Sequence, residues 1–179
     1  MATAAPSPRA VRGTVVFTDI VGFTEYTALR GDEEALALLS IQERLVQDTL
    51  PPGARVVKEL GDGLLLWFPD ACQALDASLR LQERFEREST KSTVPLWVRM
   101  GVHSGQQTRR GNDLVGHDVN VASRVVDVAG PGEILVSEAT RAEVDERLPD
   151  VSFDELGPVV MKGIPAPVRL YRALSGPPA

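Results

Sequence analysis

The segment TVVFTDIVGFT, residues 14–24, contains a run of β-branched and aromatic residues that ends in a glycine turn. This pattern predicts a strand over its first part, a break at Gly22 and a short helix after the break. Farther along, the apolar runs ARVVKEL at 54–60 and LLLWF at 64–68 flank the turn residues Gly61-Asp62-Gly63. Two such runs around a Gly/Asp cluster predict a β-hairpin.

Two long helices are predicted to connect these strands. Leucines recur at helical spacing over residues 33–50, where Asp32 can cap the N-terminus and Pro51-Pro52-Gly53 ends the helix. A second amphipathic helix follows Asp70, and LWVRMGVHSG at 96–105 supplies a fourth strand. The order β-α-β-β-α-β predicts an α+β, ferredoxin-like antiparallel sheet with helices on one face, because right-handed crossovers leave few other ways to thread it.

The rest of the chain predicts a smaller C-terminal α/β lobe. Its elements are a helix near 115–129, a strand at 133–136, a helix from a Ser137 cap to Leu148, and closing strands near 151–153 and 168–174. The small, Pro-rich ends predict disordered tails at 1–10 and 175–179. One domain is therefore expected over residues 11–174.

The composition limits the possible function classes. A length of 179 residues with 43% hydrophobic side chains suits one domain with a proper core. The net charge of −6 argues against nucleic acid and membrane as partners, because their binders carry clustered basic charge. The lone cysteine, Cys72, cannot form an internal disulfide, so the cytoplasm is the expected compartment.

Carboxylates are the chemistry that remains. The sequence has no set of zinc ligands, no G-x-S-x-G elbow and no Walker phosphate loop. His103 and His117 are interpreted as packed or capping groups, and not as ligands.

Two of these carboxylates are predicted to meet at one edge of the sheet. The first two strands run the same way, so Asp19 at the end of the first lies near Asp62 in the turn after the second. Paired carboxylates repel each other unless protons or cations neutralise them, and all-oxygen sites suit magnesium or manganese. The alternative is that Asp62 is only a turn residue and Asp19 only a strand-end cap.

The residues that follow Asp19 form a candidate phosphate site. Ile20, Gly22, Phe23 and Thr24 open a helix whose free backbone N–H groups and dipole favour a bound anion. Taken alone, Gly22 would indicate only a turn. Its position beside Asp19 is what favours phosphate binding.

Three blocks in order, FTDIVGFT at 17–24, KELGDG at 58–63 and VGHDVNVASRV at 115–125, resemble the signature blocks of class III nucleotidyl cyclase catalytic domains. The resemblance runs over about residues 11–171. It implies conversion of a nucleoside triphosphate to its 3′,5′-cyclic monophosphate and pyrophosphate. The sites would lie between two catalytic domains paired head to tail, here in a homodimer.

The resemblance also implies roles for individual residues. Asp19 and Asp62 would hold two divalent metal ions, Mg²⁺ or Mn²⁺. Asn120 and Arg124 match the family's N-x-x-x-R pair, and their four-residue spacing places them on one helix face. Asn120 would orient the ribose, and Arg124 would stabilise the transition state at phosphorus. Without the resemblance, Arg124 would be interpreted as a solvated helix charge.

Lys58 and Asp113 match the family's adenine-selecting pair. Asp113 would accept from the exocyclic amino group and Lys58 would donate to a ring nitrogen, whereas guanine would mispair with both. Alone, Lys58 could equally protect an edge strand and Asp113 cap a loop. Arg99 and Lys162 match positions that often contact the triphosphate. The prediction is therefore an adenylate cyclase with ATP as its substrate.

The sequence departs from the family's pattern at two places. Ser123 stands where alanine is common, and the loop at 106–112 is short for a dimerisation arm, which leaves the strength of dimerisation open. The alternatives to an adenylate cyclase are a guanylate cyclase and a catalytically silent nucleotide-binding module. The helix with Asn120 and Arg124 disfavours a palm-like polymerase or a diguanylate synthase.

Overall fold

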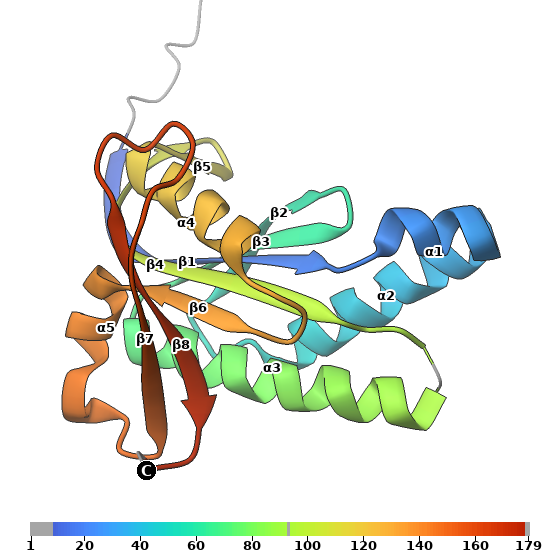
Figure 1. Cartoon of the computed structure of the whole chain (residues 1–179). Helices are drawn as coiled ribbons and strands as arrows, with labels where there is room; N and C mark the ends of the chain where they lie inside the picture. Colours follow the sequence, from blue (N-terminus) through green and yellow to red (C-terminus); the bar gives the residue numbers. More distant parts are fainter. Residues whose placement is uncertain (1–8, 93, 178–179) are drawn as a thin grey trace, which may run out of the picture.

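The computed structural model describes residues 9–92 and 94–177 (Figure 1). The expected tails at residues 1–8 and 178–179 lie outside the described residues. The elements in chain order are β1 (Arg9–Ile20), α1 (Phe23–Arg30), α2 (Asp32–Thr49), β2 (Arg55–Leu60), β3 (Gly63–Phe68), α3 (Ala71–Ser92), β4 (Val98–Arg110), β5 (Asp113–Val115), α4 (His117–Val128), β6 (Ile134–Ser137), α5 (Glu138–Val144), the 3₁₀ turn η1 (Asp145–Arg147), β7 (Val151–Val159) and β8 (Val168–Ser175).

The strands form a sheet in the order β2-β3-β1-β4-β6-β8-β7, and β5 pairs with β4. β1 lies between β3 and β4 and is antiparallel to both, while β2 is antiparallel to β3. This arrangement confirms the predicted ferredoxin-like unit. The C-terminal elements continue the same sheet, because β6 runs parallel to β4, and β8 and β7 follow it. Since β1 and β2 run in the same direction, the end of β1 lies beside the β2–β3 turn.

Helices cover both faces of the sheet (Figure 1). α2 and α3 pack on one face, where side chains such as Leu38 and Phe85 join Val16 of β1 in the main core. α4 packs on the opposite face, where Ala122 and its neighbours contact Phe17 of β1. The expectation of helices on one face therefore holds for the ferredoxin-like unit, and α4 covers the other side. Because side chains alternate along a strand, Asp19 lies on the same face as Phe17, the α4 face.

Several strands are longer than the side-chain pattern predicts. β1 begins at Arg9, so residues 9 and 10 belong to the strand and not to the expected tail, because they pair with the far end of β4. β4 itself continues past its predicted end at Gly105 to Arg110 and then turns into β5, where a loop was expected. β8 likewise includes Ser175, the first residue of the expected C-terminal tail. These segments form strands through backbone hydrogen bonds, although their side chains have no alternating apolar pattern.

The predicted helix caps are correct at two of three positions. Gly31 precedes α2 with φ 88°, and Asp32 is the first helical residue, where its negative charge is favourable next to the N-terminus. Asp32 is therefore not the cap. Asp70 does cap α3, because its Oδ1 accepts from two first-turn amides at 2.9 and 3.1 Å. Ser137 caps α5 by accepting from the Thr140 amide at 3.4 Å.

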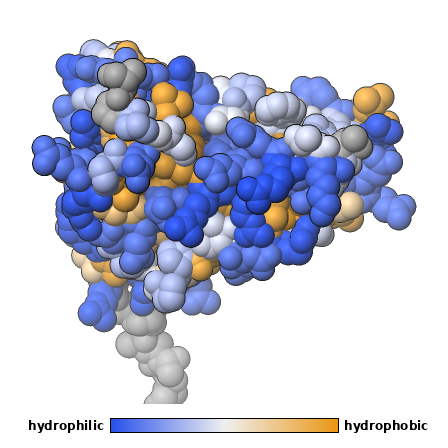
Figure 2. Space-filling model, turned by 90° about the horizontal axis from the view of Figure 1, so that it is seen from below, coloured by the Kyte–Doolittle hydropathy of each residue, from blue (hydrophilic) through white to orange (hydrophobic). Residues whose placement is uncertain are grey.

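The face seen in Figure 2 is largely hydrophilic, with apolar side chains showing between the polar ones. Among the described residues, none of the helices has the length and apolar character needed to cross a bilayer.

Candidate functional site

The fold brings Asp19 and Asp62 together. Asp19 is the next-to-last residue of β1, and Asp62 lies in the turn between β2 and β3. The β1–β3 pairing extends to Thr18 opposite Leu64. At Gly63 the two backbones approach so closely that an added Cβ would lie 2.1 Å from the Thr18 carbonyl oxygen. Glycine at this position therefore allows the turn that carries Asp62 to lie against the end of β1.

The electrostatics of Asp62 reflect this approach. The pKa of Asp62 is raised to about 6, chiefly by burial and also by the neighbouring negative charge of Asp19 and a hydrogen bond between the two side chains. The cation of Arg99 acts in the opposite direction but does not overcome these effects. The ionised form of Asp62 is thus disfavoured beside Asp19, and a bound cation would stabilise it.

Arg99 contacts Asp19 of this carboxylate pair from the neighbouring strand. It lies directly opposite Asp19 in the β1–β4 ladder, and its Nε and Nη2 are each 2.7 Å from Asp19 Oδ2. Its Nη1 donates to the carbonyl oxygen of Asp127 near the end of α4, at 3.2 Å. The predicted triphosphate-binding cation and a predicted metal ligand therefore share one place on the α4 face of the sheet.

The carboxylate pair fits a hard divalent cation. Within the described residues, there is no cluster of three or more His, Cys, Asp or Glu side chains that could hold a metal ion. Magnesium, however, is commonly held by one or two carboxylates, with water and substrate phosphates completing the octahedron. Asp19 and Asp62 supply that number of carboxylates, at a position where a cation would favour the ionised form of Asp62.

The segment after Asp19 forms a turn at Gly22 that leads into the N-terminus of α1. Gly22 has φ 73°, a left-handed conformation that glycine adopts without strain, and α1 begins at Phe23. Glycine has no side chain with which to cap the first N–H groups of α1, which include that of Thr24. The Ile20 side chain is buried in the core at 2% exposure, so only its backbone is available to a ligand.

Lys58 and Asp113 form an ion pair. Lys58 Nζ on β2 lies 2.9 Å from both carboxylate oxygens of Asp113, the first residue of β5. This hydrogen bond holds the pKa of Asp113 below its ordinary value. Arg55 strengthens the junction by donating to the Asn112 carbonyl at 3.0 Å. The β4–β5 hairpin, which sequence analysis did not predict, is therefore what brings Asp113 to Lys58.

Asn120 and Arg124 lie on the exposed face of α4, as their spacing predicts. Arg124 Nη1 is 3.3 Å from Asp127 Oδ2 on the next turn. Ser123, which stands where alanine is common, donates from its hydroxyl to the Asn120 carbonyl at 2.7 Å, a hydrogen bond within α4. Both candidate side chains point away from the sheet and are available to a molecule that approaches this helix.

Lys162 lies in the exposed turn that follows β7. Its neighbour Met161 is buried against Val121 and Val125 of α4, which holds the turn beside that helix. Lys162 is thus near the elements that carry the other candidates, although no contact joins it to Asp19 or Asp62 in the described part of the chain.

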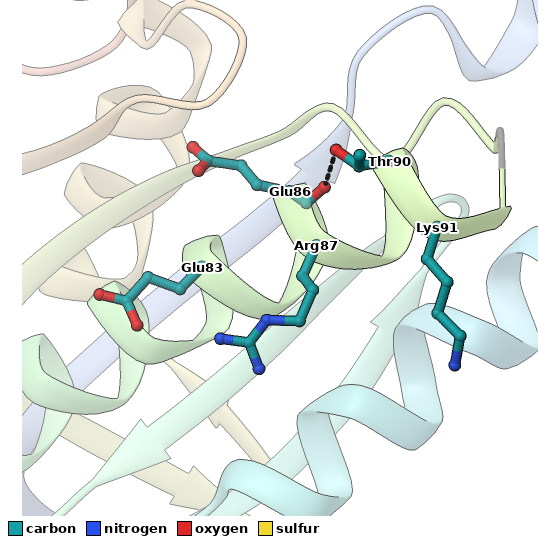
Figure 3. A pocket seen from close by; sticks show the side chains of 5 residues that line it. All are labelled: Glu83, Glu86, Arg87, Thr90 and Lys91. Carbon is teal, nitrogen blue, oxygen red and sulfur yellow. Dashed lines mark hydrogen bonds between the residues drawn. The ribbon is translucent and has the colours of Figure 1, made fainter.

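One open hollow lies apart from the candidate site residues. It has a volume of about 630 Å³ and runs along the side of α3, as Figure 3 shows. Its lining residues all belong to that helix: Glu83, Glu86, Arg87, Thr90 and Lys91. Their side chains point in different directions, and the dashed bond joins the Thr90 hydroxyl only to the Glu86 carbonyl. It contains none of the candidate residues and offers no converging set of groups.

One buried polar contact near the site was not predicted from the sequence. His103 on β4 was interpreted as a packed or capping group, and it does pack, with 7% exposure. Its Nε2 lies 3.0 Å from Oδ1 of Asp118, in the first turn of the helix that carries Asn120 and Arg124. The presence of Asp118 two residues before Asn120 was the available signal, but only the packing of α4 on β4 shows the contact.

Comparison with known proteins gives consistent matches. A family model described as the adenylate and guanylate cyclase catalytic domain matches residues 6–173. A pH-sensitive adenylate cyclase from Mycobacterium tuberculosis is 35% identical over 173 residues, or 96% of this chain. An adenylate cyclase from Streptomyces griseus is 35% identical over 134 residues, or 74% of this chain. The crystal structure of the adenylyl cyclase CyaB from P. aeruginosa superposes with a TM-score of 0.84 at 24% identity, covering 95% of this chain and 97% of that one.

The matches differ in what they cover. The chain spans 43% of the Mycobacterium tuberculosis protein and 33% of the Streptomyces griseus protein, so less than half of each relative is represented. At 24% identity, the likeness to CyaB concerns the fold.

Proposed function

The chain belongs to the family of adenylate and guanylate cyclase catalytic domains, and from this premise we propose that it converts ATP to 3′,5′-cyclic AMP and pyrophosphate. Two relatives named adenylate cyclase, each 35% identical, support this choice of activity. The observation that carries the proposal is the convergence of Asp19 and Asp62 beside Arg99. ATP is a cytoplasmic metabolite, and we assign the reaction to that compartment.

Asp19 and Asp62 are the proposed ligands of two divalent ions, Mg²⁺ or Mn²⁺. When bound, such ions lower the pKa of an attacking hydroxyl, here the ribose 3′-hydroxyl, and stabilise charge on the phosphoryl oxygens. The raised pKa of Asp62 supports this role, because burial and the charge of Asp19 disfavour its ionised form, which a bound cation would stabilise.

The remaining candidates bind and orient the nucleotide. Arg99 and Lys162 supply positive charge for the triphosphate, and the backbone N–H groups at the start of α1 can donate to its oxygens. Asn120 holds the ribose so that its 3′-oxygen faces the α-phosphorus. Arg124 donates to the oxygens that gain charge as the new bond forms, a task suited to a planar guanidinium that stays charged.

The Lys58–Asp113 pair is the proposed selector for adenine. In this pair the ammonium group supplies a donor and the carboxylate an acceptor, side by side at 2.9 Å. Adenine presents the complementary acceptor and donor, whereas guanine presents a carbonyl and a ring N–H. Each mispaired buried contact costs about 1–3 kcal/mol, so two together favour ATP over GTP by orders of magnitude.

We infer that a second copy of the chain completes the site, in a head-to-tail homodimer. Asp19 and Arg99 lie on the sheet beside α4, but Asn120 and Arg124 project from the outer side of that helix, away from the sheet. A nucleotide held at Asp19 and Asp62 of one copy can then be reached by the α4 side chains of the other.

The test is the purified protein with MnCl₂ and an equal mixture of ATP and GTP, with the products separated by chromatography. Cyclic AMP and pyrophosphate in equal amounts, with little cyclic GMP, are the expected result. Cyclic GMP as the main product would instead identify a guanylate cyclase. Nucleotide binding without any cyclic product would identify a catalytically silent binding module.

A further inference from the structure

A buried histidine joins the helix of the candidate site to the rest of the fold. His103 on β4 uses both ring nitrogens: Nε2 lies 3.0 Å from Oδ1 of Asp118 on α4, and Nδ1 lies 2.6 Å from the hydroxyl of Ser137. Ser137 is also the N-cap of α5. One imidazole ring thus connects β4, the first turn of α4 and the start of α5.

The protonation of this group follows from its surroundings. Burial lowers the pKa of His103, against the opposing effect of Asp118. Burial would raise the pKa of Asp118, but hydrogen bonds from His103 and from the Gln106 amide hold it below its ordinary value. The favoured state is a neutral imidazole whose Nε2–H donates to an ionised Asp118 and whose Nδ1 accepts from the Ser137 hydroxyl.

A second contact fixes the same aspartate. Oδ2 of Asp118 accepts from the Gln106 amide at 2.7 Å. Gly105 provides the space, because an added Cβ there would lie 2.1 Å from that oxygen. The residue before α4 is Gly116, which has no side chain with which to cap the helix. The first turn of α4 is therefore held through Asp118 to β4.

The other end of α4 also lies directly on β4. At Gly101 an added Cβ would lie 2.3 Å from the Val126 amide nitrogen, so the helix backbone rests on the strand. With this contact at one end and Asp118 at the other, the rotation of α4 about its axis is determined. Because the side chains project from one regular backbone, a small rotation of the helix about its axis displaces every side chain on the outer face.

We propose that His103 and Asp118 are positioning residues, which set the rotation of α4 and thereby place Asn120 and Arg124 against the nucleotide. The inference rests on the proposed function, since those two side chains act on the substrate only in a cyclase. His103 and Asp118 themselves touch no reacting atom. Their contribution is to keep the outer face of α4 in one orientation.

The same polar network supplies a matched control. Ser104, the neighbour of His103, has its hydroxyl oxygen 2.8 Å from that of Thr14 and 3.0 Å from that of Thr140. These contacts join β4 to β1 and α5 and do not involve α4. A Ser104→Ala change therefore removes buried hydrogen bonds of the same kind while the contact between His103 and Asp118 stays.

The experiment compares steady-state kinetics of four variants with Mn²⁺ and ATP. Asp118→Asn and His103→Leu should lower kcat at least tenfold, with the KM for ATP within about threefold, because the metal ligands and the adenine pair are untouched. His103→Gln, whose amide N–H can still donate to Asp118, should recover a substantial part of kcat. Ser104→Ala should lower the melting temperature and leave kcat within about twofold.

Hydrogen exchange of the α4 amides gives a readout that does not depend on activity. Exchange in residues 117–124 should become faster in Asp118→Asn and His103→Leu and stay unchanged in Ser104→Ala. An unchanged kcat in Asp118→Asn, or an equal loss of kcat in Ser104→Ala, would overturn the positioning role. Absence of cyclic nucleotide with the unsubstituted protein would instead refute the proposed function. Hydrogen exchange of the α4 amides that stays slow in Asp118→Asn would refute the claim that Asp118 holds α4 on β4.

Discussion

Replacing Asp62 with asparagine should stabilise the metal-free protein while abolishing its activity. Burial and the charge of Asp19 raise the pKa of Asp62 from 3.8 to about 6. The folded protein therefore retains a proton on Asp62 at a pH at which the unfolded chain has already lost it. Stability from this group is complete below the unfolded pKa and is lost as the pH rises through about 6. Asparagine imitates the protonated carboxyl at every pH, and its amide can still donate to Asp19.

The size of the effect follows from the same values. A difference of about two pH units corresponds to ~3 kcal/mol at about 1.4 kcal/mol per unit. Because Asp62 is partly exposed, solvent screening reduces this to about 1–2 kcal/mol near pH 8. At about pH 4 the carboxyl is neutral in the folded protein, and the difference between the two proteins should nearly vanish.

The assay is urea unfolding in the presence of EDTA, followed by circular dichroism at both pH values. Asp19→Asn is the control: it also removes one charge of the pair, but it leaves Arg99 without its ion-pair partner and should not stabilise. Adding Mn²⁺ should stabilise the unsubstituted protein more than Asp62→Asn. A less stable Asp62→Asn protein near pH 8, or the same difference at both pH values, would show that burial and Asp19 do not disfavour the ionised form of Asp62.

Three further predictions concern catalysis. Mixing inactive Asp19→Ala and Arg124→Ala proteins should restore part of the activity, measured as cyclic AMP formation, because one site in the mixed dimer keeps both residues. No recovery in a mixture shown to contain heterodimers would exclude a site shared between copies. Arg124→Lys should lower kcat at least tenfold at similar KM, because a point charge cannot make the paired hydrogen bonds of a guanidinium; an unchanged kcat would remove Arg124 from the transition state. Lys58→Glu combined with Asp113→Ser reverses the donor and acceptor pattern. The double variant should lower the ratio of cyclic AMP to cyclic GMP at least tenfold in a competition assay. An unchanged ratio would show that the pair does not select the base.

The sequence was sufficient to predict the part of the fold that creates the site. The β-branched run ending at Asp19 and the Gly-Asp-Gly turn at Asp62 each predicted a local element. The direction of the connecting helix then required the two ends to meet, which the structure confirms. Local patterns and chain direction thus carry enough information for this pair, because both residues lie at strand ends.

The contacts that sequence patterns could not predict depend on tertiary packing. Asp113 reaches Lys58 only because β4 runs on through polar residues and turns back as β5, and backbone pairing, which leaves no side-chain signature, orders that hairpin. The pair of His103 and Asp118 exists because α4 lies on the opposite face of the sheet from α2 and α3. Its position there depends on the space at glycines 101 and 105, and not on any periodic pattern.

The direct test of the carboxylate pair is a count of bound Mn²⁺ by electron paramagnetic resonance, with 3′-deoxy-ATP as a ligand that lacks the attacking hydroxyl. Asp76→Asn, which changes an exposed carboxylate on α3, is the matched control. Two ions per nucleotide are expected in the unsubstituted and control proteins, and loss of at least one in Asp62→Asn. Two ions bound with unchanged affinity in Asp62→Asn would contradict the assignment of Asp62 as a metal ligand.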